Sequence, residues 1–170
     1  MEIKDLQALY ARHPKVKALA KALANEKKHT VSVAGLQASS AALTFASLPD
    51  MGRPFLFILD DLEEAGYFYH DLVQILGEQR VLFFPSSYRR AVKFGQRDAA
   101  NEILRTEVLA KLTTIGAAAP MVVSYPEAIA ERVVSKKTLD DRTLQLRVGE
   151  QVGIDFVEQT LLAFGFQRTD

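Results

Sequence analysis

The residues from Val31 to Leu48 have the layout of a phosphate-binding loop. Residues 30–34 are mostly apolar or β-branched, as in a buried strand, and Gly35 opens a tight turn. An alanine-rich helix is predicted to follow, from 39 to 48. A strand, a glycine turn and a helix in this order cradle phosphate groups in nucleotide-binding folds. Nucleotide chemistry is therefore the first hypothesis for this turn.

The side chains at the turn do not support that chemistry. When the pattern G-x-x-x-x-G-K-[ST] is laid over the chain, Gly35 takes the first glycine and Ser40 the second. The lysine then falls on Ala41 and the hydroxyl residue on Ala42. A working loop needs the lysine ammonium on the β- and γ-phosphates and the hydroxyl on Mg²⁺, and alanine supplies neither. The residues predict either a degenerate phosphate loop or an ordinary strand-to-helix turn.

A second candidate site is the basic segment from Ser86 to Arg97, which has no acidic residue. Basic side chains interleaved with aromatic ones suit contacts with nucleic acid, and ligands often bind beyond the carboxyl ends of parallel strands. The alternative is a solvated loop whose aromatic side chains pack on the sheet, and the neutral charge of the chain slightly favours it. The four basic residues are Arg89, Arg90, Lys93 and Arg97.

The remaining polar residues do not predict a catalytic or metal site. Asp60 and Asp61 end a predicted strand, where carboxylates can serve as metal ligands or acids. Capping of the next helix, with Asp60 paired to Glu63, is the better explanation. The three histidines are far apart and lack metal-ligand spacing. One alternative stays open, in which Gly35, Asp60 and the basic segment line a pocket for a nucleotide or another phosphorylated small molecule.

Composition narrows the class of protein. The chain has 170 residues, with 21 basic and 21 acidic side chains, so a domain that mainly coats nucleic acid is not expected. There is no cysteine, which excludes disulfides and thiolate sites. Neither a signal peptide nor an apolar run of membrane-spanning length is present. We expect a soluble cytoplasmic protein that does not contact membranes.

The distribution of apolar residues predicts an α/β fold with three layers, in which a mostly parallel sheet lies between helices. The predicted strands are continuously apolar, which is typical of a parallel sheet covered on both faces. Two amphipathic helices precede the first strand. Asp98 is predicted to cap the helix at 98–113, and Asp155 together with Glu158 is predicted to cap the helix at 155–164. The strands are expected at 31–34, 55–59, 81–84 and 121–124, and the helices after them at 39–48, 61–76, 98–113 and from Pro126.

The predicted domain organisation has three parts. Residues 1–134 form the degenerate nucleotide-binding-like α/β domain, and 135–142 form a polar linker. Residues 143–170 are expected to open a second, incomplete α+β domain. They supply a half-exposed strand at 143–148 and a helix at 155–164 that ends at Gly165.

Several segments together resemble the N-terminal region of the bacterial transcription-repair coupling factors, a family related here to the B subunit of the excision nuclease. The degenerate loop is one of them, since the coupling factors lack the intact loop of the B subunit. The segment after the third strand is too short for the aromatic damage-probing hairpin of the B subunit. The other similar segments are Leu82–Tyr88 followed by a helix with Arg105, Met121–Ile129, Leu146–Glu150 and Phe164–Asp170.

The resemblance implies a non-catalytic scaffold and interaction module of nucleotide excision repair, without a cofactor or a metal. The second domain would recruit the A subunit of the excision nuclease. Arg168 matches the arginine of an aromatic-x-Arg-x-Asp segment that contacts this partner, and a guanidinium suits bidentate pairing with a carboxylate. Binding of RNA polymerase and ATP-driven translocation on DNA would belong to other domains of the parent protein.

Overall fold

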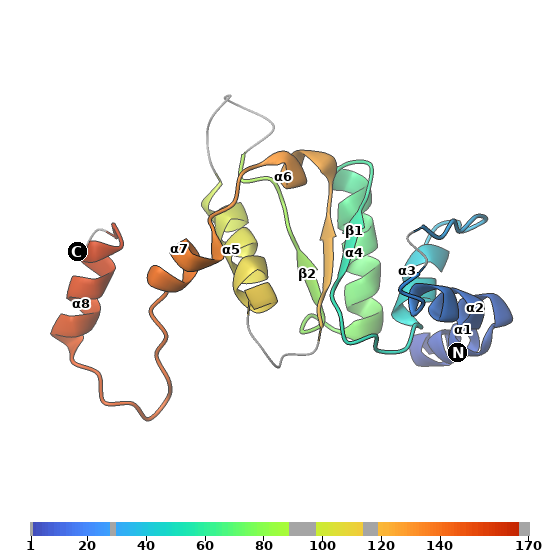
Figure 1. The fold of residues 1–170 in the computed structure, drawn as a ribbon, viewed down its shortest axis with the longest axis horizontal. Coiled ribbons are helices and arrows are strands. Elements are labelled where there is room, and N and C mark those ends of the chain that lie inside the picture. The colour runs from blue at the N-terminus through green and yellow to red at the C-terminus, as the bar shows by residue number, and fades with distance from the viewer. Residues whose placement is uncertain (1, 28–29, 89–97, 114–118, 167–170) are drawn as a thin grey trace. The chain divides into compact units, whose positions relative to one another are not determined.

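The chain divides into two compact units in this computed structural model, which describes residues 2–27, 30–88, 98–113 and 119–166 (Figure 1). The first unit is Met1–Arg132 and the second is Val133–Asp170. The first unit mixes helices with a small, open, parallel sheet, so the α/β prediction is confirmed for this part of the chain.

The first unit begins with helices α1 (Ile3–Arg12) and α2 (Pro14–Leu23). Pro14 occupies the first turn of α2, where its missing N–H costs nothing, and the Nδ1 atom of His13 accepts the N–H of Lys15. Helix α3 is Ser40–Ala46, and residues 30–37 before it are irregular. Gln7 links α1 to α3, because its side chain donates to the carbonyl of Ala46 over 2.7 Å.

The sheet has three strands, β1 (Phe55–Ile58), β2 (Val81–Phe83) and β3 (Met121–Ser124). The strand order is β1-β3-β2 and both pairings are parallel, so β3 is the central strand. All four residues of β3 are buried, as expected for a central strand covered on both faces.

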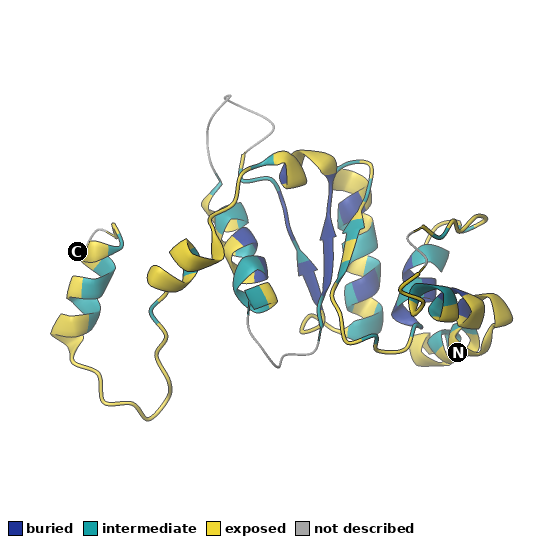
Figure 2. Ribbon diagram, viewed as in Figure 1, coloured by how far each residue is buried: buried dark blue, intermediate teal, exposed yellow. Residues whose placement is uncertain are grey.

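Helices α4 (Leu62–Leu76) and α5 (Ala99–Thr113) cover opposite faces of the sheet (Figure 1). Phe57 and Phe83 both pair with Val123, so they point to one face, and they contact α4 through Phe68 and Tyr69. Phe84 follows Phe83 and points to the other face, where it contacts Arg105 of α5. Figure 2 shows the buried positions gathered on the sheet and on the helices beside it. The short helix α6 (Pro126–Ala130) follows β3.

The strand predicted at 31–34 is not formed, which corrects the expected four-stranded sheet. Residues 30–37 are irregular, and the free edge of β1 stays unpaired within the described part of the chain. Leu56 and Ile58 point to the same face of the sheet as Phe84, and on this edge strand they remain 54% and 55% exposed. The side chains of Val31 and Val33 instead line a groove against α1 and α2. A β-rich sequence becomes a strand only where a neighbouring strand pairs with it.

The helix starts agree with the predictions to within a residue or two, but two predicted caps are wrong. Asp61, rather than Asp60, caps α4 by accepting the N–H of Glu64 over 2.9 Å. Asp98 caps α5 as predicted, since its carboxylate accepts the N–H of Ala100 over 3.0 Å. The predicted cap by Asp155 and Glu158 is replaced by Gly153, which has no side chain to accept a hydrogen bond.

The second unit contains helices α7 (Lys136–Asp141) and α8 (Ile154–Ala163). Residues 135–142 were predicted to be a linker, but α7 forms there because the hydroxyl of Ser135 caps it at the N–H of Thr138. The strand predicted at 143–148 is absent, and these residues are irregular. Gly165 ends α8 with φ +93°, the left-handed conformation that glycine adopts without strain. None of the described residues of this unit is buried.

We predict that the sheet and α4 form the stability core of the first unit. Leu72 is fully buried in α4, so Leu72→Ala should lower the free energy of unfolding by about 3 kcal/mol. The same substitution at half-exposed Leu56 should cost about 1 kcal/mol or less. Urea denaturation followed by circular dichroism measures both, and equal losses would show that α4 does not pack as described.

Candidate functional site

The turn at Gly35 is closed by its own hydrogen bonds. Gly35 has φ +84° and Ala38 has φ +46°, so the chain turns through two left-handed positions. The hydroxyl of Ser40 accepts the N–H of Gln37 over 2.6 Å, which ties the start of α3 to the turn. Ala41 is partly buried and Ala42 fully buried. Nothing in this geometry replaces the missing ammonium or metal-binding hydroxyl.

A groove of about 870 Å³ lies beside this turn. Its walls are α1, α2, the irregular residues 31–36 and the start of α3, and most of its lining side chains are apolar. A volume of this size is within the range of small-molecule sites, which is roughly 300–1,000 Å³. Gly35 and Ser40 both contribute to the lining.

The structure does not bring together the three segments proposed to line a phosphate pocket. Gly35 borders the groove, whereas Asp60 does not. Asp60 is exposed beyond the end of β1, next to the capping residue Asp61. Residues 89–97, with Arg89, Arg90, Lys93 and Arg97, lie outside the described residues.

A polar cluster occupies the carboxyl ends of β2 and β3, where ligands bind in many α/β proteins. Its centre is the carboxylate of Glu131, just after α6, which accepts hydrogen bonds from the hydroxyls of Ser86 and Ser87. The N–H of Ser87 also donates to both carboxylate oxygens, over 3.1 and 3.0 Å. Tyr125 accepts the N–H of Ser86 through its hydroxyl, over 2.8 Å. The chain leaving β2 is therefore held at both serines.

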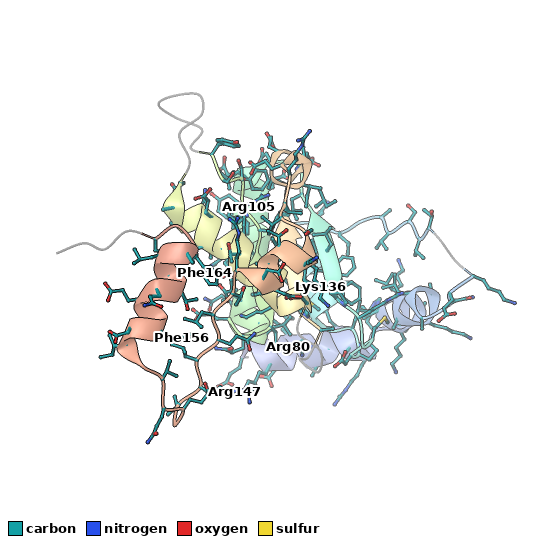
Figure 3. All side chains as sticks on the ribbon, turned by 60° about the vertical axis from the view of Figure 1, so that its left-hand side comes forward. Arg80, Arg105, Lys136, Arg147, Phe156 and Phe164 are labelled. Atoms are coloured by element: carbon teal, nitrogen blue, oxygen red, sulfur yellow. The ribbon has the colours of Figure 1, made fainter. Side chains whose placement is uncertain are left out.

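Arg105, labelled in Figure 3, belongs to α5 and contacts this cluster. Its Nη1 atom donates to the carbonyls of Pro85 and Ala128, over 2.8 and 3.0 Å, and lies 3.5 Å from a carboxylate oxygen of Glu131. The guanidinium carbon lies 4.1 Å from the ring centre of Phe84. The Nη2 atom is buried and has no hydrogen-bond partner in the described part of the chain. A buried donor without a partner lowers the stability of the fold by about 1–3 kcal/mol. A desolvated cation–π contact stabilises it by about 2 kcal/mol and can offset that loss.

Electrostatics keep Glu131 ionised. Burial raises the pKa of this carboxyl, but hydrogen bonds from Ser86 and Ser87 and the charge of Arg105 lower it by more, so the pKa lies below its usual value. Both carboxylate oxygens of Glu131 already accept hydrogen bonds from Ser86 or Ser87. The cluster therefore has the chemistry of a structural clamp, since its acceptor and its two hydroxyls are committed to one another.

Sequence reasoning did not find this clamp. Glu131 lies 44 and 45 residues from Ser87 and Ser86, so no local pattern connects them. One signal was available in α5, where Arg105 precedes Val108 by three residues and both are buried. An arginine on the buried face of a helix needs carbonyl or carboxylate partners.

The other candidate positions form no metal site within the part of the chain that the structure describes. No group of three or more acidic or histidine residues could hold a metal ion among the described residues. Arg168 lies outside the described residues. No helix in the described ranges is both long and apolar enough to cross a membrane.

Comparisons with known proteins identify no relative. No family model matches the chain, and neither a curated protein nor a solved structure is significantly similar to it.

We predict that the clamp stabilises the first unit in a pH-dependent way. A carboxyl whose pKa is lowered by folding contributes stability above its unfolded-state pKa and loses it as the pH falls through the folded-state pKa. Glu131→Gln should therefore cost about 2 kcal/mol of unfolding free energy at neutral pH. The difference from wild type should shrink as the pH falls to about 3.

Urea denaturation across this pH range provides the measurement. Glu26→Gln is the matched control, since Glu26 is exposed and should give no comparable loss at any pH. A loss for Glu131→Gln that stays constant with pH would contradict an ionised, hydrogen-bonded carboxylate.

Proposed function

We propose that the chain is a non-catalytic scaffold and interaction module of a transcription-repair coupling factor, acting in transcription-coupled nucleotide excision repair. Its first unit would be a degenerate nucleotide-binding domain arranged in three layers. Its second unit would belong to the surface that recruits the A subunit of the excision nuclease. ATP hydrolysis, translocation on DNA and displacement of RNA polymerase would be the work of other domains of the parent protein.

The observation that carries this proposal is the packing of the Gly35 turn. The positions that correspond to the phosphate-binding lysine and the metal-binding hydroxyl are Ala41 and Ala42. Ala42 has no exposed surface and belongs to the hydrophobic core, and the hydroxyl of Ser40 is engaged within the turn. A turn built this way supports the loss of nucleotide chemistry and leaves the fold as a scaffold.

Exposed apolar side chains in the second unit support the interaction role. Ile154 and Phe156 on α8 are 83% and 57% exposed, and Phe166 after the helix is 62% exposed. Figure 3 shows Phe156 and Phe164 near the two ends of the helix. Large exposed apolar residues that gather on one element are typical of surfaces that bind another polypeptide.

The first test is calorimetric titration of the chain with Mg-ATP and Mg-ADP. Because the ammonium and the hydroxyl are both missing, no heat of binding is expected at about millimolar nucleotide. Micromolar affinity would mean that the turn still binds phosphate through backbone N–H groups, and would overturn the scaffold assignment. Such a result would favour the alternative of a nucleotide-binding α/β domain.

The second test measures binding to the A subunit of the excision nuclease. Arg168→Ala should weaken the complex by about tenfold or more, since a buried guanidinium–carboxylate pair usually costs a few kcal/mol when one partner is removed. Arg142→Ala is the matched control, because Arg142 is an exposed arginine of the same unit and precedes the predicted partner-binding residues 143–170. Surface plasmon resonance with immobilised A subunit gives both affinities. Absence of binding by the unmodified chain, or equal losses in both variants, would contradict the assigned partner or residue.

A further inference from the structure

The groove between α1, α2 and residues 31–36 is mostly apolar and has one charged side chain, Lys15, in its lining, and the scaffold function proposed above does not use it. We infer that it binds an anionic amphiphile, meaning an alkyl chain that ends in a carboxylate or another small anionic group. This inference does not depend on the proposed repair function.

The interior of the groove fits an alkyl chain. Leu6 and Leu9 line it from α1, Val16 and Leu19 from α2, and Val33 from the irregular segment. Leu9 and Val33 remain 57% and 43% exposed, so the groove leaves apolar surface open to solvent. When a ligand removes apolar surface from water, the binding free energy becomes more favourable by roughly 25 cal/mol per Å². Most of the lining is aliphatic, which favours an alkyl chain over a nucleobase.

The charges at the rim select an anion. Lys15 is the one charged side chain in the lining, and no acidic residue is among the described residues that form it. Lys15 is exposed and has no ion pair in the described ranges of the chain. It also lies in the first turn of α2, where the helix dipole is unfavourable for a cation. An anionic group beside Lys15 would offset this repulsion.

Polar side chains are the minority in the lining of the groove, where most residues are aliphatic; the polar ones are Tyr10, His13, Lys15, Ser32, Ser40 and Thr44. A nucleotide would need several directed hydrogen bonds, whereas an alkyl carboxylate needs one cation and apolar contact. The size of the groove, its apolar lining and the charge of Lys15 therefore all favour an anionic amphiphile as the ligand.

Sodium decanoate, below its micellar concentration, is the probe, and it is added to the ¹⁵N-labelled chain in an NMR titration. Saturable shifts are expected at backbone amides of α1, α2 and residues 31–36. Lys15→Glu should raise the dissociation constant by about fivefold or more, because an attractive pair becomes a repulsive one. Leu9→Glu should abolish the saturable shifts, since it places a carboxylate on exposed apolar lining.

Lys17→Glu is the matched control, because Lys17 is exposed on the same helix but does not line the groove. It should leave the affinity nearly unchanged, and decyltrimethylammonium, which has the same chain length and the opposite charge, should not saturate the site. Circular dichroism checks that each variant folds. Absence of saturable shifts in the wild type, equal losses for Lys15→Glu and Lys17→Glu, or equal binding of the cationic amphiphile would each overturn the inference.

Free amphiphiles and anionic lipids share this chemistry, and sedimentation with phosphatidylglycerol vesicles distinguishes the two sources. Sedimentation that Lys15→Glu abolishes, with decanoate binding intact in the wild type, would assign the site to lipid at a bilayer surface. A chain that binds decanoate and stays in the supernatant would assign it to the free amphiphile.

Discussion

Strand β3 is the constraint on which the first unit depends. It pairs with β1 on one side and β2 on the other, and helices cover both of its faces, so it has no exposed edge and no exposed face. Its one polar residue, Ser124, fits there because its hydroxyl donates to the carbonyl of Phe84 over 2.8 Å. The residues that follow the strand, Tyr125 and Glu131, are placed at the carboxyl end of the sheet by this burial. The position of the polar clamp is thus a consequence of the position of β3.

The clamp lies at the carboxyl ends of β2 and β3, where ligands bind in many α/β proteins. The ends of β2 and β3 are adjacent, so the Ser86–Ser87 segment meets the residues that follow β3. Glu131 accepts hydrogen bonds from both serine hydroxyls, and Arg105 donates to the carbonyls of Pro85 and Ala128. Groups that are mutually satisfied in this way rigidify a segment and leave little for a ligand. The buried Nη2 atom of Arg105 shows that this arrangement carries a cost, which the contact with Phe84 offsets.

The sequence pattern predicted those parts of the fold that depend on apolar periodicity. The strands at 55–58 and 81–83 consist of apolar residues, and the central strand at 121–124 has a single polar residue, Ser124. Apolar runs of this kind are typical of a parallel sheet covered by helices. The segments at 31–34 and 143–148 have equally strand-like residues but no neighbour that pairs with them, and pairing is not encoded locally. Glu131 was missed for the same reason, since its partners are more than forty residues away. Local pattern predicts which residues can be buried, and long-range pairing decides where.

The absence of phosphate-binding side chains at the Gly35 turn is linked to the packing of α3. Ala42 and Ala46 are both part of the hydrophobic core, on the side of α3 that faces the sheet and α4. A hydroxyl residue at position 42 would have to bury its polar atom beside other apolar side chains, at a cost of about 1–3 kcal/mol unless a partner were supplied. Small side chains let α3 approach closely, and Phe45 of α3 then contacts Phe57 of β1 with ring centres 5.0 Å apart. The packing of α3 therefore favours small apolar side chains at positions 42 and 46.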